Sequence, residues 1–359
     1  MLSTSQTSGS LEGSIIMASQ NSVLVTGGAG FLGSHLTRSL LEDPRFNGLQ
    51  IVVLDDLSGG FVENVPKSPQ VFFVEGSVTN HELIDRLFQE HKFSYVFHLA
   101  AYAAEGLSHF IRRFNYLNNL LGSVNLINAS VRHSVQHFVF TSSIAVYGSG
   151  QVPMLESTQP QPEDPYGISK FAVELDLKAA HEQFGLKFTV FRPHNVYGEY
   201  QNIGDKYRNV VGIFMNRIML GQPLPIFGDG LQQRAFSYVG DIIPPMISSP
   251  FVAEANCEVF NVGATTPTTV LDLAKSVCRE FQIEPNIQFL SARNEVKVAW
   301  ADHSRCARVF GENTATSMTD GLHRMANWAR SVGGRSSSHF DHVEITQGLP
   351  AGWGSMTDK

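Results

Sequence analysis

The sequence has few cysteines, no surplus of positive charge and no long apolar run. Its three cysteines, Cys257, Cys278 and Cys306, stand far apart, and no Cys-x-x-Cys pair or Cys/His cluster is present. This argues against a disulfide framework or a metal site, and we expect reduced thiols that are buried or neutral. The 26 Lys and Arg residues are outnumbered by 33 Asp and Glu residues, for a net charge of −7. Without a basic stripe to neutralise phosphates, nucleic acid is not an expected partner.

Nothing in the sequence indicates export or membrane association. No run approaches the roughly 18 apolar residues of a membrane-spanning helix. Residues 1–20 contain no Lys or Arg, and the apolar run at residues 15–18 is too short for a secretion signal. We therefore expect a cytoplasmic protein with a disordered tail at residues 1–20. The small and polar residues 333–339 indicate a flexible joint, with a C-terminal extension at residues 336–359.

Short apolar runs alternate with helical stretches over the first half of the chain. Strands are predicted at residues 23–25, 50–56, 71–76, 95–101, 137–143 and 188–198. These runs are continuously apolar, as in parallel strands buried on both faces. Such repeats form a doubly wound α/β (Rossmann) sheet, which binds ligands at the carboxyl ends of its strands. After residue 198 the pattern is less regular, so we predict a Rossmann domain at residues 21–198 and a smaller C-terminal substrate-binding lobe at residues 199–335.

Three glycines, Gly27, Gly30 and Gly33, follow the first predicted strand and lead into a helix. Glycine lets the backbone turn tightly against a pyrophosphate, and the helix N-terminus supplies N–H groups and a positive dipole end. Asp55 closes the next strand about twenty residues later, where an acid accepts hydrogen bonds from a ribose 2′-hydroxyl and repels a 2′-phosphate. The pattern favours NAD over NADP. The alternative is a tight structural turn with a surface aspartate.

Tyr166 and Lys170 lie four residues apart at the start of a predicted helix, so they share one helical face. Tyrosine has an ordinary pKa near ~10, but an adjacent ammonium and the positive charge of an oxidised nicotinamide favour its phenolate. Ser143 ends a buried strand, where its hydroxyl can share a substrate proton with Tyr166. Taken alone, this tyrosine–lysine spacing is more typical of an ordinary helix with an exposed tyrosine and a solvated lysine. Together with the serine and the glycine loop, they indicate a catalytic group.

These motifs together resemble the extended short-chain dehydrogenase/reductase family, in particular its nucleotide-sugar epimerases and dehydratases. The resemblance spans about residues 22–332 and is carried by TGGAGFLGSHL, FHLAA, TSSIAVYG, PYGISK, RPHNVYG, IFGDGLQQRAFSYVGD and FNVG. In this family, dehydratases place an acidic pair just after the catalytic hydroxyl, and related decarboxylases place a glutamate there. Ile144 and Ala145 stand at those positions here. What remains is the minimal Ser/Tyr/Lys set of the UDP-glucose 4-epimerases.

The resemblance therefore implies an NAD-dependent nucleotide-sugar 4-epimerase for UDP-glucose and UDP-galactose. Tyr166 would take the proton of the sugar 4-hydroxyl, with Ser143 bridging, while C4 gives hydride to NAD. The 4-keto sugar would then turn in the site and take the hydride back on its other face. Ala299 is small where the family gates the C2 substituent, which extends the hypothesis to N-acetylated sugars. A homodimer is also implied, through helices near residues 104–130 and 166–184.

The same resemblance assigns further binding residues. NAD would be held by Gly27, Gly30, Phe31, Leu32, Gly33, Asp55, Val78, Leu99, Ala100, Ala101, Asn119, Tyr166, Lys170 and His194. The substrate would be held by Ser143, Tyr166, Asn195, Arg234, Arg293 and Glu295, with the two arginines clamping its diphosphate. Surface ion pairing is the alternative for Arg293, and a structural role is the alternative for His194.

Two rival functions stay open. One is another reaction of the same family, namely that of a GDP-sugar epimerase, a reductase or a dehydratase, because HNVYG beside FGDGLQQR also resembles the GDP-mannose branch. The other is a non-catalytic protein that binds the dinucleotide. The intact Ser143, Tyr166 and Lys170 argue against that second rival.

Overall fold

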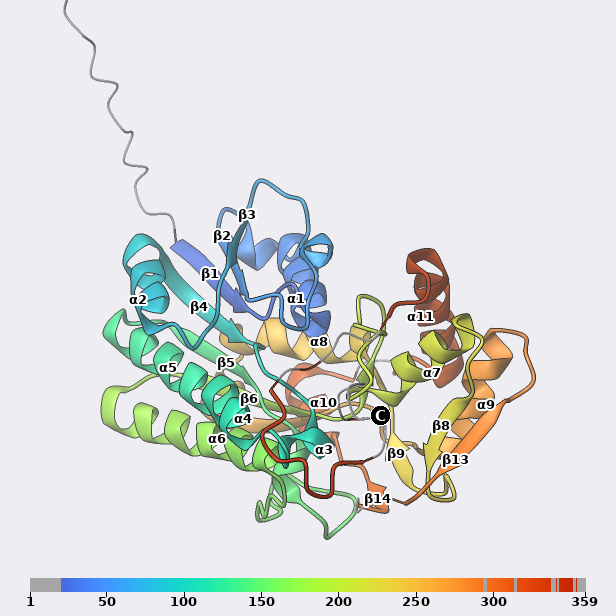
Figure 1. Ribbon diagram of the computed structural model, residues 1–359. Coiled ribbons are helices and arrows are strands. Elements are labelled where there is room, and N and C mark those ends of the chain that lie inside the picture. The colour runs from blue at the N-terminus through green and yellow to red at the C-terminus, as the bar shows by residue number, and fades with distance from the viewer. Residues whose placement is uncertain are drawn as a thin grey trace, which may run out of the picture.

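Seven parallel strands form the central sheet of the computed structural model, in the order β11-β6-β5-β4-β1-β2-β3 (Figure 1). The structure describes residues 21–292, 296–312, 315–336, 340, 342–350 and 353. The strands are β1 (Asn21–Thr26), β2 (Gln50–Asp55), β3 (Val71–Glu75), β4 (Lys92–His98), β5 (His137–Thr141), β6 (Phe188–Pro193) and β11 (Glu258–Val262). The chain runs outward from β1 to β3 and then returns through β4 toward the opposite edge. This order confirms the predicted doubly wound α/β fold.

The sheet is buried on both faces, as its continuous apolar strands require. Val23 and Val25 of β1 lie in one core, whereas Leu24 lies in the other. The first core is covered by α1 (Phe31–Glu42) and α8 (Val239–Ser248), and the second by α2 (His81–Glu90), α5 (Gly122–Arg132) and α6 (Pro165–Phe184). Full burial of a Val or Leu side chain contributes about 1.5–3 kcal/mol, so these two layers supply much of the driving force for folding.

Strand β11 joins the edge of this sheet by pairing with β6, although it lies beyond the predicted division at residue 198. The buried ring of Phe260 in β11 stacks on Phe191 of β6, with ring centroids 5.9 Å apart. Helix α10 (Ser304–Phe310) packs against β11. The two lobes are therefore interleaved along the chain, because the apolar β11 is buried best at the open edge of the main sheet.

The smaller lobe holds α7 (Val210–Met219), α9 (Val270–Glu280) and α11 (Met318–Val332) around short sheets. These pair β8 (Leu224–Phe227) with β13 (Ile287–Leu290), β7 (Val196–Tyr197) with β10 (Ser237–Tyr238), and β9 (Gln233–Ala235) with both β12 (Pro267–Thr269) and β14 (Val298–Ala299). After β4 come the short helices α3 (Glu105–Ser108) and α4 (Arg112–Tyr116), followed by a π-helical turn at Leu117–Leu121. Single 3₁₀ turns lie at Pro44–Phe46, Val62–Asn64, Ile144–Tyr147, Ser249–Phe251 and Ala253–Ala255.

Beyond α11 the chain turns back across the molecule. Arg335 lies in the predicted flexible joint, yet its backbone N–H donates to Asn216 Oδ1 at 2.8 Å and its carbonyl accepts from Asn216 Nδ2 at 2.9 Å. Farther on, Phe340, residues 342–350 and Trp353 lie against the region of α3 and α4 (Figure 1). We call these described residues the C-terminal segment. The predicted tail at residues 1–20 lies outside the described residues.

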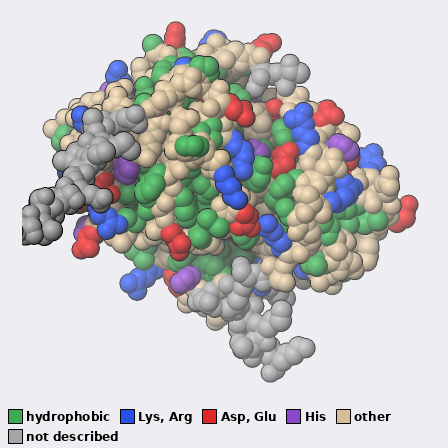
Figure 2. Space-filling view, turned by 90° about the horizontal axis from the view of Figure 1, so that it is seen from above, with side chains coloured by type: hydrophobic (Ala, Val, Ile, Leu, Met, Phe, Trp, Pro, Cys, Tyr) green, Lys and Arg blue, Asp and Glu red, His purple; other side chains and the backbone are tan. Residues whose placement is uncertain are grey.

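Charged side chains of both signs are interspersed on the face that Figure 2 shows. Across the described ranges, no helix combines the length and the apolar character needed to cross a membrane. Cys278 and Cys306 are buried and Cys257 is half-buried, and all three are free. Burial raises the pKa of each thiol, so the cysteines are neutral near pH 7, as expected from the sequence.

Candidate active site

The glycine loop after β1 is packed so closely that Gly27 and Gly33 leave no room for a side chain. Gly27 has a φ of +71°, and its N–H donates to the Leu54 carbonyl at 2.8 Å. A Cβ on Gly33 would lie 2.1 Å from the Gly27 oxygen, and a Cβ on Gly27 would lie 2.7 Å from Ala100 N. Gly30, which precedes α1, makes no side-chain cap. The first amides of α1 are therefore available to an anion, and the loop fits a dinucleotide phosphate.

Asp55 ends β2 directly beside this loop. It is only 7% exposed, and its carboxylate accepts from Ala29 N at 3.0 Å and from Leu57 N at 2.8 Å. Burial raises the pKa of this carboxyl group, and the two backbone amides oppose that rise. The amides fix the carboxylate at the strand end and leave lone pairs that can accept ribose hydroxyls.

The other residues predicted to hold the cofactor surround the same strand ends. Phe31 and Leu32 open α1, and Val78 contacts Gly122 of α5. Leu99 and Ala100 follow β4, and their N–H groups donate to the Thr26 carbonyl at 3.2 Å and to Thr26 Oγ1 at 3.3 Å. Ala101 is the next residue along the chain. The structure thus brings the residues expected at the cofactor groove together from β1, β2 and β4.

Asn119 is buried in the π-helical turn and bonded entirely to the protein. Its Oδ1 accepts from Tyr102 N at 2.7 Å, while its Nδ2 donates to the Tyr102 carbonyl at 3.1 Å and to Asn115 Oδ1 at 2.7 Å. Asn115 in turn donates to the Pro165 carbonyl at 2.9 Å. This chain of amides ties the loop after β4 to the first turn of α6, where Tyr166 stands.

Local sequence signals place Tyr166 at the start of α6. The Asp164 carboxylate caps the helix by accepting from Gly167 N at 2.9 Å, and Pro165 occupies the first turn. Lys170 follows one turn later and is only 2% exposed. Its Nζ donates to the Thr141 carbonyl at 2.8 Å and lies 5.8 Å from the Tyr166 ring centroid. Ser143 lies just after β5 and forms a hydrogen bond with Tyr166. The predicted catalytic group is therefore assembled at the carboxyl edge of the sheet.

Burial sets the charge state of this group in the protein alone. It raises the pKa of the Tyr166 phenol, although the Ser143 hydrogen bond and Arg208 act in the opposite direction. Burial also lowers the pKa of Lys170 to about 7, against the attraction of Glu174. The sequence predicts that the Lys170 ammonium and an oxidised nicotinamide together favour the Tyr166 phenolate, and in the protein alone the ammonium donates to the Thr141 carbonyl. The site is short of positive charge, which an oxidised nicotinamide would supply.

A buried ion pair behind the catalytic helix was not predicted from the sequence. Glu174 and Arg192 form a two-pronged salt bridge, with Arg192 Nε 2.9 Å from Glu174 Oε1. Ser142 donates to the same Oε1 at 2.5 Å. The pair joins α6, β6 and the end of β5, which fixes Lys170 and Ser143 relative to one another. Residues 166, 170 and 174 are four apart and share one helix face, and this spacing could have indicated that Glu174 lies close to the catalytic pair.

Two further residues predicted to bind the substrate, Asn195 and Arg234, lie near the point where β6 passes into the smaller lobe. Asn195 has a φ of +41°, and its Nδ2 donates to the Ala235 carbonyl at 3.2 Å. Arg234 lies in β9, where its Nη1 donates to the Gln233 carbonyl at 2.9 Å and to the Lys297 carbonyl at 3.3 Å. The predicted Arg293 and Glu295 lie outside the described residues.

His194 is engaged by protein groups at both ring nitrogens. Its Nδ1 lies 2.9 Å from the Ala235 carbonyl, and its Nε2 lies 3.0 Å from Nε2 of His303. Since a carbonyl only accepts, His194 donates from Nδ1 and accepts from His303 at Nε2. Burial lowers the pKa of His194 to about 4 and that of His303 to about 3, so both rings are neutral. This arrangement leaves His194 no free nitrogen for a cofactor and favours its structural role.

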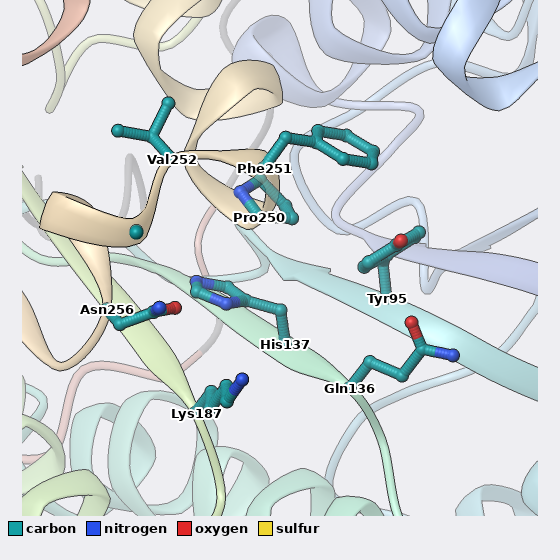
Figure 3. A pocket seen from close by; sticks show the side chains of 9 residues that line it. Tyr95, Gln136, His137, Lys187, Pro250, Phe251, Val252 and Asn256 are labelled. Atoms are coloured by element: carbon teal, nitrogen blue, oxygen red, sulfur yellow. The ribbon is translucent and has the colours of Figure 1, made fainter.

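A pocket of about 270 Å³ lies at the opposite edge of the sheet (Figure 3). It is lined by Gln136 and His137 at the start of β5, by Lys187 just before β6, and by Phe251 and Asn256 among others. Because the catalytic group stands at the carboxyl ends of the strands, this pocket takes no part in the site described above.

Comparison with known proteins agrees with this geometry. The chain matches the NAD dependent epimerase/dehydratase family over residues 23–263. UDP-glucose 4-epimerase of Mycolicibacterium smegmatis is 30% identical over 314 residues, covering 86% of this chain and 98% of the relative. dTDP-D-glucose 4,6-dehydratase of Mus musculus is 29% identical over 321 residues, covering 86% and 88%. The solved structure of Thermus thermophilus UDP-glucose 4-epimerase in complex with NAD has a TM-score of 0.78 and 30% identity, covering 86% of this chain and 98% of that one.

These similarities confirm the family inferred from the sequence and its cofactor, NAD. They include both epimerases and dehydratases, so they establish a nucleotide-sugar enzyme family without choosing one reaction. The matched region spans the glycine loop, Asp55, Ser143, Tyr166 and Lys170. The chain therefore belongs to the NAD dependent epimerase/dehydratase family.

Proposed function

We propose that the chain is a nucleotide-sugar 4-epimerase that interconverts the C4 epimers of a UDP-hexose. The observation that carries this proposal is the environment of Ser143. The next two residues, Ile144 and Ala145, are buried, and Ile144 packs in an apolar cluster with Met154 and Ala299. No carboxylate stands at those two positions to protonate a leaving hydroxyl, as the elimination of water requires. The site therefore favours oxidation and reduction at C4 without elimination.

Each member of the catalytic group then has a distinct task. Tyr166, once its phenol is ionised, removes the proton from the 4-hydroxyl, and Ser143 shares that proton through its hydrogen bond. Lys170 places its amino group 5.8 Å from the Tyr166 ring centroid and would hold the nicotinamide ribose. When bound, NAD accepts the hydride from C4 and returns it, so no second substrate is consumed. The buried position of Tyr166 and Lys170 keeps bulk water away from the proton transfer.

A UDP-sugar is the proposed substrate. Asn195 and Arg234 stand at the entrance to the smaller lobe, where an amide and a guanidinium suit a diphosphate. For Arg293 and Glu295, the proposal rests on their positions in the sequence alone. Ala299 is buried next to Ile144, so the site keeps a small side chain near the proposed sugar position. This supports the extension to N-acetylated sugars.

A dehydratase is the second candidate, and Glu105 is the observation that favours it. This exposed residue of α3 lies close enough to Tyr166 to raise the pKa of the phenol, so a carboxylate is present near the reacting centre. The Glu105→Gln variant separates the two reactions. Unchanged formation of a 4-epimer supports the epimerase, whereas loss of a 4-keto-6-deoxy product supports the dehydratase.

We also propose a homodimer that pairs α6 and the neighbouring π-helical turn with their copies. Leu117, Leu121, Ile168 and Leu175 are exposed on these elements, and Leu175 is 53% exposed. Apolar side chains gathered in this way are typical of a self-complementary interface. Leu121→Asp together with Leu175→Asp should give monomers in light scattering. Phe289→Asp, at an exposed apolar residue of β13 outside the proposed interface, is the matched control and should leave the dimer intact.

Product analysis tests the proposed reaction. The purified protein is incubated with UDP-glucose, UDP-galactose, UDP-N-acetylglucosamine or GDP-mannose without added cofactor, and the products are identified by NMR. We expect the 4-epimers of the UDP-sugars and no net change in NAD. A 4-keto-6-deoxy product, or turnover of GDP-mannose alone, would contradict the proposal.

A further inference from the structure

Arg208 belongs to the smaller lobe, and its positively charged guanidinium lies against the loops at the cofactor groove. Its Nη2 lies 2.8 Å from the position that a Cβ on Gly59 would occupy. Gly59 and Gly60 form the turn after Asp55, and a Cβ on Gly60 would lie 2.6 Å from the Ala29 carbonyl oxygen. Gly60 therefore packs against the glycine loop, and the Arg208 guanidinium packs against Gly59. Arg208 also acts electrostatically on Tyr166, so it lies within reach of the catalytic group.

The surrounding loops lack a cation of their own. Residues 27–33 and 57–60 contain neither Lys nor Arg. Arg208 is paired with one carboxylate oxygen, Asp205 Oδ2, which lies 2.6 Å from both Nε and Nη2. Within the part of the chain that the structure describes, its Nη1 makes no hydrogen bond. A guanidinium with open donors beside an uncapped helix N-terminus is a site for a diphosphate, because its planar fork matches phosphate oxygens.

We propose that Arg208 binds the pyrophosphate of NAD, and that the C-terminal segment is the element that holds Arg208 in place. The inference concerns cofactor binding and does not depend on which sugar reaction the enzyme performs. The diphosphate of a nucleotide-sugar substrate could bind the same guanidinium. The contact with Gly59 favours the cofactor, because Gly59 lies in the turn that follows the strand ending at Asp55.

The C-terminal segment packs on both neighbours of Arg208. The guanidinium carbon of Arg208 lies 4.9 Å from the ring centroid of Tyr102, which in turn lies 4.9 Å from the ring of Phe340. Tyr207 lies 5.6 Å from the ring of Trp353, and its hydroxyl donates to the Trp353 carbonyl at 3.1 Å. The segment thus presses the loop that carries Arg208 against the loop after β4. These rings form one apolar cluster.

A carboxylate between Phe340 and Trp353 also anchors the segment. Glu344 accepts from Arg113 N at 2.8 Å and from Phe114 N at 2.7 Å, which caps the start of α4 from a distant part of the chain. The ring of His342 stacks on Phe114 with centroids 4.7 Å apart. The segment is therefore fastened to the Rossmann side through α4 and to the other lobe through Tyr207. This double attachment lets it keep Arg208 at the cofactor groove.

Binding measurements with matched variants test the assignment. NAD content per chain is measured after acid denaturation, and the affinities for NAD and for UDP are measured by calorimetry on protein stripped of nucleotide. Arg208→Gln should weaken NAD binding by about 10- to 100-fold, the loss expected for a hydrogen bond to a charged group. UDP binding should stay unchanged, and Arg208→Lys should recover part of the loss. Arg217→Gln, at a half-buried arginine of α7 bonded to Gln222, is the control.

Wild-type NAD affinity in Arg208→Gln would overturn the assignment, as would a loss confined to UDP. The role of the C-terminal segment is tested by Trp353→Ala and by the milder Tyr207→Phe, which removes only the hydroxyl bond. Both variants should weaken NAD binding. When either is combined with Arg208→Gln, the loss of NAD affinity in the double variant should be smaller than the sum of the losses in the two single variants. Full additivity, or an unchanged NAD affinity in both single variants, would refute the positioning role.

Discussion

Replacing Lys170 by methionine should stabilise the NAD-free protein at low pH, even though it removes a proposed catalytic residue. Methionine keeps most of the length of the side chain without its charge. Burial lowers the pKa of Lys170 from 10.5 to about 7, so the fold bears a cost for holding this ammonium. Functional sites commonly carry such costs.

The structure sets the size and pH range of the effect. At 1.36 kcal/mol per pKa unit, the lowered pKa corresponds to roughly 5 kcal/mol. Loss of the hydrogen bond to the Thr141 carbonyl offsets about 1–3 kcal/mol of that gain. Below pH 7 the lysine is charged in both folded and unfolded chains, so the cost is fully present. Between pH 7 and 10.5 only the unfolded chain holds the proton, so the stability of the native protein rises with pH.

Urea denaturation of NAD-free protein at about pH 6 and about pH 9.5 measures this difference. Lys170→Met should be more stable than the native sequence by about 2–4 kcal/mol at the lower pH. Its advantage should fall close to zero at the higher pH, where only about 1 kcal/mol of the cost remains. A variant less stable than the native protein at both pH values would refute the reasoning.

Three other substitutions probe the site. Gly33→Ala should abolish NAD retention, measured as bound nucleotide after gel filtration, because the new Cβ would meet the Gly27 oxygen at 2.1 Å; retained NAD would contradict the described packing. Glu174→Gln should lower the free energy of unfolding by about 3–5 kcal/mol, since it leaves buried Arg192 without its counter-ion, whereas exposed Glu182→Gln should change it little. Tyr166→Phe should lower turnover by about 10²- to 10⁴-fold; full turnover in that variant would remove the tyrosine from the mechanism.

The features that the sequence predicted are those fixed by local patterns. The apolar runs indicated parallel strands because burial on both faces leaves no polar positions, and the structure confirms them. The cap at Asp164 and the four-residue spacing of Tyr166 and Lys170 are local too, and the helix forms as expected. Gly27 and Gly33 were identifiable because no other residue fits their positions.

The features that escaped prediction depend on contacts between distant parts of the chain. Glu344 caps α4 across 230 residues of sequence, and nothing near either position signals this. Arg208 gains its place only once two lobes meet around Gly59. The contact between His194 and His303 and the pairing of β11 with β6 also join residues that are far apart in the sequence. The charge state of Lys170 also follows from burial, which composition and spacing do not reveal.

The most direct test of the proposed function follows the hydrogen on C4 of the sugar. UDP-glucose carrying deuterium at C4 is incubated with the purified protein without added cofactor, and the product is examined by NMR and mass spectrometry. Removal and return of hydride at one carbon predicts UDP-galactose with the deuterium retained at C4. Deuterium found at C6 of a 4-keto product, or lost to solvent, would contradict the proposed 4-epimerase.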